Sequence, residues 1–223
     1  MEIKLRLEEE KDYRQVEEVT REAFWNVYAP GCDDHLLVHK LRENPQFIKA
    51  LDYVATHDDK IVGHIIYVES KIIANDGTEH KTAAFGPISV LPEYQHKGVG
   101  SKLITHTAKL AKEMGYPAIV IYGEPEYYKR FGFKLSKEYK ITNQDKKYPA
   151  AMQVWELYPN ALKGIEGTYD EGGIYETDPA ELLEFEKGFP VKEKKHTKTQ
   201  ERFLEMVSNC LLYTSPSPRD STS

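Results

Sequence analysis

Hydrophobic and polar positions along the chain follow two periods, and these change from one segment to the next. Residues 2–7 alternate polar and apolar side chains, which is typical of a half-buried strand. Later segments carry apolar residues at helical spacing or in short runs between turn residues. The pattern predicts helices over 12–24, 34–42, 98–114, 180–185 and 200–207, and strands over 51–56, 61–69, 82–90, 118–122, 133–141 and 152–157.

One predicted strand contains a proline. Gly86 and Pro87 interrupt the strand over 82–90. Because proline cannot donate a hydrogen bond to a neighbouring strand, we expect a bend or bulge there. The run AIVIY at 118–122 is apolar throughout, so we expect it to be covered on both faces.

Composition and charge narrow the class of protein. With 223 residues, 40% of them hydrophobic, the chain has enough apolar material for one core, and its length predicts one domain with an appendage. The net charge of −6 argues against a nucleic-acid partner. The sequence has no apolar run long enough for a membrane helix, and MEIKLRLEEE has no signal-peptide core. Its two cysteines, Cys32 and Cys210, form no disulfide framework or zinc set, so we expect a cytoplasmic protein without a metal.

The last residues of the chain have an unusual composition for a folded segment. Residues 210–220, CLLYTSPSPRD, resemble one reading frame of a transposase adapter used in sequencing libraries. The alternative is a natural disordered Ser/Pro-rich end. Either way we treat 209–223 as a non-native or disordered tail with no role, and the native C-terminus stays open.

The segment QHKGVG carries the most informative chemistry. Gln95, Gly98 and Gly100 stand at the expected start of a helix, where glycines let backbone N–H groups approach an anion. Ser101 and Lys102 add a hydroxyl group and a positive charge nearby. The P-loop and dinucleotide patterns both fail here, because neither GK[ST] nor a third glycine follows. An ordinary glycine-containing helix start is the alternative.

Three pieces in order resemble the GNAT-type N-acetyltransferases, and in particular their YhbS-like bacterial branch. They are ISVLPEYQHKGVGSKLI, AIVIY and YYKRFGF. The resemblance covers about residues 3–167. It implies an α/β fold in which helices flank a mixed, mostly antiparallel twisted sheet that is splayed at the cofactor site. The expected organisation is a GNAT domain over 1–167, an extension with short helices over 168–208, and the tail over 209–223.

The resemblance also implies acetyl-CoA as co-substrate. Its pyrophosphate would lie on backbone amides of the loop, and its pantetheine arm would pair with the preceding strand. A backbone N–H of Val90 or a neighbour would stabilise charge on the thioester oxygen. The cofactor-binding residues are then Ile88, Ser89, Val90, Gln95, His96, Lys97, Gly98, Val99, Gly100 and Ser101.

The implied reaction is direct attack of a primary amine, on a small molecule or a peptide, on the thioester. Tyr128 maps to the family's proton donor; the alternatives are a packing role for Tyr128 or the donor role for Tyr127. The general base that would take the amine proton stays unassigned, because residues like each candidate more often have a structural role or simply face solvent. These candidates are His64, Glu93, Glu124 and Glu126.

The sequence also allows two other classes of function. A catalytically silent acyl-CoA sensor of the same fold is the second class of function, and an interaction protein using the charged segment VKEKKHTK is the third. The sequence does not identify the amine that accepts the acetyl group. We expect residues 26–48 and the segment after Phe133 to shape the site that binds this amine. Because many relatives pair, a homodimer is an expected state.

Overall fold

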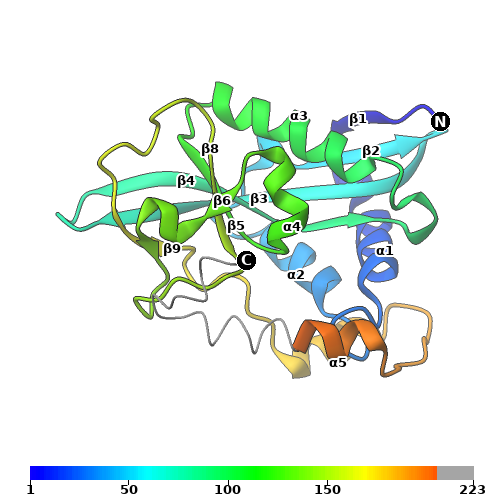
Figure 1. Cartoon of the computed structure of the whole chain (residues 1–223). Helices are drawn as coiled ribbons and strands as arrows, with labels where there is room; N and C mark the ends of the chain where they lie inside the picture. Colours follow the sequence, from blue (N-terminus) through cyan, green and yellow to red (C-terminus); the bar gives the residue numbers. More distant parts are fainter. Residues whose placement is uncertain (205–223) are drawn as a thin grey trace. The chain divides into compact units, whose positions relative to one another are not determined.

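The computed structural model describes residues 1–204. It divides into two compact units (Figure 1). Unit 1 comprises Met1–Tyr67, Gly86–Thr107 and Gly173–Leu204, and unit 2 comprises Val68–Phe85 and Ala108–Gly172. The tail predicted over 209–223, with Cys210, lies outside the described residues. The boundary predicted at residue 167 stays a prediction.

The fold is a mixed α/β structure with a mostly antiparallel open sheet flanked by helices, as predicted. The strands are hydrogen-bonded in the order β1-β2-β3-β4-β5-β8-β6, and β9 pairs with both β3 and β7. In the part of the chain that the structure describes, β4 pairs parallel with β5 and β7 pairs parallel with β9. Within residues 1–204, no helix is long and apolar enough to cross a membrane.

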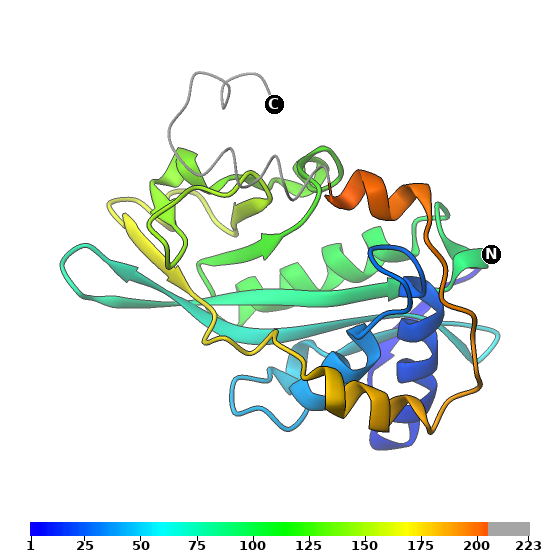
Figure 2. The ribbon, with the colours of Figure 1, turned by 90° about the horizontal axis from the view of Figure 1, so that it is seen from below.

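Unit 1 is built on the antiparallel strands β1 (Lys4–Leu7), β2 (Tyr53–His57) and the first part of β3 (Lys60–Ala74). Helices α1 (Tyr13–Phe24) and α2 (Asp34–Leu41) lie on one side of these strands (Figures 1 and 2). The first half of α3 (Val99–Glu113) covers the other side, where the Tyr67 hydroxyl lies 2.9 Å from Thr107 Oγ1.

The C-terminal segment of unit 1 packs on α1 and α2. Helix α5 (Pro179–Glu186) places Glu186 against Arg21, whose guanidinium donates two hydrogen bonds of 2.9 and 2.8 Å to the carboxylate. Beyond α5, the Trp25 indole N–H donates to the carbonyl of Glu193 at 3.0 Å. Figure 2 shows α5 beside these two helices. The predicted short helix over 180–185 is thus confirmed, and residues 198–204 are also helical.

Unit 2 is centred on β5 (Ala118–Tyr122), which pairs antiparallel with β8 (Met152–Glu156). The short strand β6 (Lys134–Leu135) pairs with β8, and β9 (Gly167–Asp170) pairs with β3 and with β7 (Ile141–Thr142). Helix α4 (Pro125–Tyr128) follows β5. One core lies between these elements and contains Ile72, Ala118, Val120, Ile141, Met152, Val154, Leu162 and Tyr169.

The strand β4 (Glu79–Val90) continues through the predicted interruption. Gly86 has a φ of 149°, which favours glycine, and the Gly86–Pro87 peptide bond is cis. The register of β4 with β5 consists of one parallel pair, Ala83 opposite Ile119, which comes before Gly86 in the chain. Beyond that pair, the residues of β4 that were predicted to meet the cofactor have no registered partner in β5.

The predicted strand over 133–141 is wrong. Only Lys134–Leu135 and Ile141–Thr142 are strands, and a 3-10 helix over Ser136–Tyr139 separates them. Ser136 is buried and Lys140 has a positive φ of 54°, so the chain turns where the apolar pattern suggested a straight run.

Candidate active site

The loop between β4 and α3 presents a row of backbone N–H groups. Its turn from Gln95 to Gly98 is exposed, with positive φ values of 58° at His96 and 83° at Gly98. The first backbone hydrogen bond of α3 runs from Lys102 N to Gly98 O, at 3.0 Å. Among residues 1–204, no acceptor is found for the N–H groups of residues 96–101. These groups and the helix dipole favour an anion.

Side chains hold the loop without covering this row. Gln95 Nε2 donates to the carbonyl of Val90 at 3.0 Å, and Lys97 Nζ donates to the carbonyl of Glu93 at 2.7 Å. A Cβ added to Gly98 would meet no described atom within 4 Å. The loop therefore offers an open backbone surface beside the end of β4.

The end of β4 directs alternate amides away from β3. Leu91 N donates to Val62 O of β3 at 2.9 Å. Because N–H groups of a strand alternate between its two edges, those of Ile88 and Val90 point away from β3. The Ser89 side chain is buried, 3.2 Å from Thr20 Oγ1 of α1, so it is engaged within the protein.

The strand and the loop are brought together by a close approach at Gly63 of β3. An added Cβ there would lie 3.0 Å from Val99 Cγ1 and 3.2 Å from the carbonyl of Ser89. Both sets of predicted cofactor residues, 88–90 and 95–101, are thereby placed together within unit 1.

Tyr128 lies in unit 2, in an aromatic cluster at the end of β5. Its ring centroid is 6.0 Å from that of Phe85 and 5.6 Å from that of Phe133. The ring lies directly beside Gly123, where an added Cβ would be 2.4 Å from Tyr128 Cε2. Tyr127 instead has the Arg130 guanidinium 4.3 Å from its ring centroid. The proton-donor role of Tyr128 stays a prediction.

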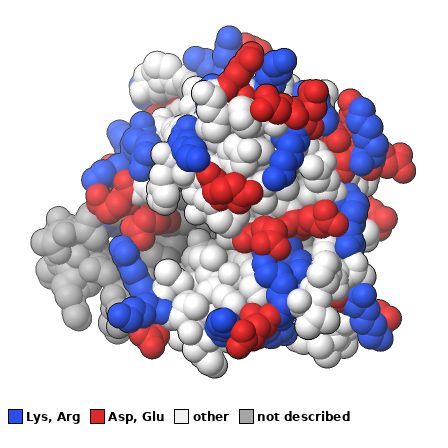
Figure 3. Space-filling view, turned by 90° about the vertical axis from the view of Figure 1, so that its right-hand side faces the viewer, with Lys and Arg blue, Asp and Glu red and all other residues white. Residues whose placement is uncertain are grey.

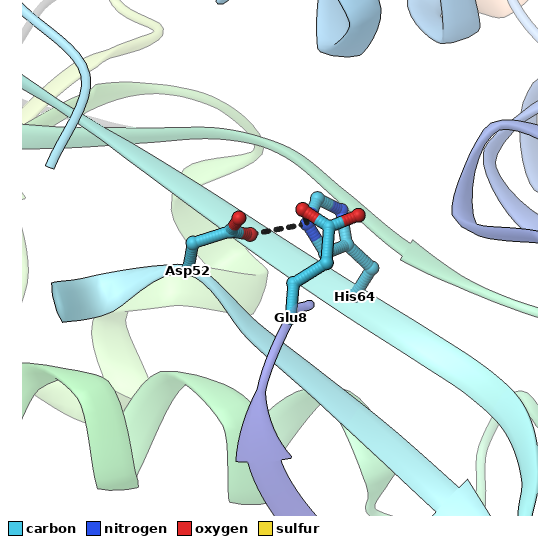
Figure 4. Close-up of side chains that lie close together, drawn as sticks. All are labelled: Glu8, Asp52 and His64. Atoms are coloured by element: carbon cyan, nitrogen blue, oxygen red, sulfur yellow. Dashed lines mark hydrogen bonds and ion pairs between the residues drawn. The ribbon is translucent and has the colours of Figure 1, made fainter. Parts of the chain in front are cut away.

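The structure removes His64 from the candidate bases (Figure 4). The ring is fully buried on β3, with Nε2 2.6 Å from Asp52 Oδ1 and 3.6 Å from Glu8 Oε2. Burial alone would lower the pKa of His64, but the two carboxylates outweigh it and raise that pKa to about 9. His64 is therefore enclosed by its carboxyl neighbours and has no exposed atom with which to take a proton from an amine, and its buried Nδ1 has no hydrogen-bond partner among the described residues.

The group formed by Glu8, Asp52 and His64 has the composition of a metal site, with potential ligand atoms within 4.8 Å of one another. The Arg42 guanidinium already donates to both oxygens of Glu8, at 2.6 and 3.2 Å. It also donates to Glu17 at 2.8 Å. A metal ion would have to sit beside this positive charge, so these residues fit an ion-pair network better than a metal centre.

The other candidates lie at the surface. Glu126 is ion-paired with Lys129, and Glu93 lies 3.8 Å from Lys60 Nζ. Glu124 is exposed just before α4.

On the face shown in Figure 3, acidic and basic side chains are interspersed. Burial raises the pKa of the Cys32 thiol, which does not favour a nucleophilic role for this cysteine.

A second group of side chains lies at the end of β5, and the sequence analysis did not identify it. The Tyr122 ring centroid lies 6.4 Å from that of Tyr169 on β9, and the Tyr122 hydroxyl lies 3.6 Å from Met152 Sδ. Glu171 directly follows β9, two residues after Tyr169. Burial and the charges of Glu171 and Asp145 raise the pKa of Tyr122.

A family model described as "Acetyltransferase (GNAT) domain" matches residues 4–136, more than half of the chain. The chain belongs to the GNAT acetyltransferase family. Among curated proteins, this GNAT chain is 30% identical to the uncharacterized N-acetyltransferase YhbS of Escherichia coli K12 over 153 residues. That match covers 63% of this chain and 89% of YhbS. YjhQ, an uncharacterized N-acetyltransferase of the same organism, is 29% identical over 148 residues, which are 66% of this chain and 75% of YjhQ.

Solved structures agree with this GNAT assignment. E. coli YhbS in complex with CoA superposes with a TM-score of 0.68 and 25% identity, over 78% of this chain and 91% of that one. A GNAT acetyltransferase from Brucella melitensis in complex with acetyl-CoA gives a TM-score of 0.63 and 26% identity, over 78% and 99% of the two chains.

Proposed function

We propose that this chain transfers an acetyl group from acetyl-CoA to a primary amine of a small molecule or peptide. The observation that carries the proposal is the row of unpaired backbone N–H groups over residues 96–101, at the start of α3 and beside the end of β4. This arrangement fits a pyrophosphate followed by an extended arm. The complexes of two relatives with CoA and acetyl-CoA support it.

Acetyl-CoA supplies the acetyl group as a thioester. The amides of residues 96–101 would hold its pyrophosphate, and the outward-facing amides of Ile88 and Val90 would pair with its pantetheine arm. The N–H of Val90 would also donate to the thioester oxygen as charge develops there. Tyr128 would protonate the departing sulfur, because a phenol with a pKa near ~10 is protonated at neutral pH.

Two measurements test the proposal. Calorimetry determines whether the full chain binds CoA. Thiol release from acetyl-CoA is then followed with polyamines, aromatic amines, amino-acid amides and short peptides, and products are verified by mass. We expect CoA binding and amine-dependent thiol release with at least one class. Binding without transfer to any of them would favour the sensor alternative, and absence of binding would contradict the proposed site.

A further inference from the structure

The residues after α5 fold back onto the loop that follows α1. Trp25 Nε1 and Asn26 Nδ2 both donate to the carbonyl of Glu193, each at 3.0 Å. The backbone N–H of Lys195 donates to Asn26 Oδ1 at 3.1 Å. These hydrogen bonds join segments from opposite ends of the chain, and we call residues 187–204 the strap.

Asn26 is the residue at which the loop and the strap are joined. It has a left-handed φ of 60°, and its Oδ1 also accepts from the Gly31 N–H at 2.8 Å, which closes the loop over 26–31. Its carbonyl accepts from Thr197 Oγ1 at 3.0 Å and from Gln200 Nε2 at 2.9 Å. Gln200 is buried, so its hydrogen bond is shielded from water. The strap is therefore part of what fixes the conformation of this loop.

Three aromatic rings meet where the loop and the strap join. The ring centroids of Phe24 and Tyr28 are 5.9 Å apart, and the Phe203 centroid lies 4.6 Å from that of Tyr28. Phe203 belongs to the helical residues 198–204, which lie beside the loop in Figure 2. Tyr28 is 45% exposed, and the other two rings are half-buried. We call Phe24, Tyr28 and Phe203 the aromatic wall, and it presents ring surface to solvent.

The aromatic wall begins one helical turn from the strand that would hold the cofactor. Thr20 Oγ1 of α1 lies 3.2 Å from Ser89 Oγ of β4, and Phe24 is four residues beyond Thr20. Residues four apart share a helix face, and a rise of about 1.5 Å per residue separates them by about 6 Å along the axis. Val90, whose N–H would donate to the thioester oxygen, directly follows Ser89. All these residues belong to unit 1, so the wall lies close to the expected place of the acetyl group.

Charges beside the wall narrow the kind of amine that fits. The Arg21 guanidinium lies 4.3 Å from the Trp25 ring centroid, and Lys192 Nζ lies 5.6 Å from it. Basic residues of the strap also outnumber its acidic residues, Glu193 and Glu201. Positive charge disfavours an acceptor with several ammonium groups, whereas exposed rings favour contact with another ring.

We propose that the acceptor is a monoamine with an aromatic group that packs on the aromatic wall, and that Phe203 makes the strap part of the acceptor site. This inference rests on the proposed acetyl transfer and adds no chemical step to it. The wall binds the ring of the acceptor and orients its amino group towards the end of β4. Tyr28 and Phe203 are then specificity-determining residues, and the extension beyond α5 has a function in substrate selection.

The test measures kcat/KM for 2-phenylethylamine and 3-phenylpropylamine against hexylamine and spermidine. For wild type, we expect the better of the two aromatic amines to exceed both other amines by about tenfold or more. Tyr28→Ala and Phe203→Ala should bring the ratio of aromatic amine to hexylamine close to one. Their CoA affinity and their kcat/KM with hexylamine should stay within about threefold of wild type.

The matched control is Leu183→Ala, which removes a side chain of α5 that is 67% exposed and lies outside the wall and the strap. It should keep the wild-type ratio. Equal losses with aromatic amine and hexylamine in Tyr28→Ala and Phe203→Ala would show a structural role and overturn the inference. If an alanine variant does not fold, Tyr28→Leu or Phe203→Leu replaces it, because leucine keeps an apolar side chain without the ring.

The wild-type selectivity separates this inference from the proposed function. Acetylation of hexylamine, spermidine or a peptide at least as fast as of both aromatic amines would overturn the inference and leave acetyl transfer standing. Absence of transfer from acetyl-CoA to every amine tested would remove both.

Discussion

Arg42 pairs with buried carboxylates of unit 1. Its replacement by methionine tests how much this pairing contributes to the free energy of unfolding. Only 4% of the Arg42 side chain is exposed, and its guanidinium contacts Glu8 and Glu17, which are 0% and 7% exposed. Arg42→Met keeps an apolar stem but leaves two buried carboxylates without their cation. Removing one partner of a buried pair typically costs about 3–5 kcal/mol.

Both carboxylates keep one imidazole neighbour in this variant. His39 Nδ1 lies 2.8 Å from Glu17, and His64 Nε2 lies 3.6 Å from Glu8. We therefore expect the free energy of unfolding to fall by about 3 kcal/mol, the lower end of that range. For a chain of this size, the corresponding decrease in Tm is about 6–12 °C.

The loss should depend on pH in a defined direction. Burial would raise the pKa of Glu8, but the neighbouring His64 and Asp52 and two hydrogen bonds from Arg42 hold it well below its usual range. A depressed folded-state pKa stabilises the protein above the unfolded-state value of ~4.3 and loses this effect as pH falls. Without Arg42 the pKa of Glu8 rises, so the gap between wild type and variant should be full near pH ~7 and shrink as the pH falls below about 4.

Urea unfolding followed by circular dichroism measures both quantities. The matched control is Lys11→Met, because Lys11 and Glu9 form an ion pair of 2.8 Å with side chains 69% and 55% exposed. We expect that control to lose less than about 1 kcal/mol. If Arg42→Met loses no more than Lys11→Met, or loses the same amount at every pH, the buried network does not carry the stability assigned to it.

Three further changes test other parts of the molecule. Gly100→Val should place a side chain beside the first amides of α3 and weaken CoA binding by about tenfold or more without unfolding, and an unchanged calorimetric affinity would contradict the anion site. Tyr128→Phe should lower kcat by about 100-fold with CoA affinity retained; turnover equal to wild type would leave only ring packing as its role. Glu186→Ala should lower the free energy of unfolding by about 3 kcal/mol, because it leaves the buried Arg21 without its carboxylate partner. Glu181→Ala, which removes an exposed ion pair with Lys40, should cost less than about 1 kcal/mol. Equal decreases in Tm for the two variants would refute this reasoning.

Elements with local signals were predictable from sequence. The amphipathic spacing in α1 and α3 and the apolar run of β5 set their positions to within a few residues. The strand β9 was not predicted, because its four residues carry no period and it forms by pairing with β3, far away in sequence. The residues over 133–141 were misassigned for the converse reason: their pattern resembled a strand, but only the two ends find partners.

The same distinction separates the parts of the candidate site. The loop over 95–101 depends on glycines and a helix start, which are local properties, so its conformation could be predicted from the sequence. The surroundings of His64 instead depend on residues that are distant in sequence. Glu8 directly follows β1 and Asp52 directly precedes β2, and both carboxyl groups lie close to the His64 ring on β3, an arrangement that no local pattern shows.

Register decides which amides of β4 remain for a cofactor. Leu91 donates to β3, so the outward N–H groups are those of Ile88 and Val90, and a shift of one residue would exchange them with Ser89 and Leu91. The packing of Ser89 against Thr20 holds this register from the side of α1. On the opposite side, α3 can approach because Gly63 has no Cβ. One register and one missing side chain therefore set the amides of the strand and those of the loop at the same place in unit 1.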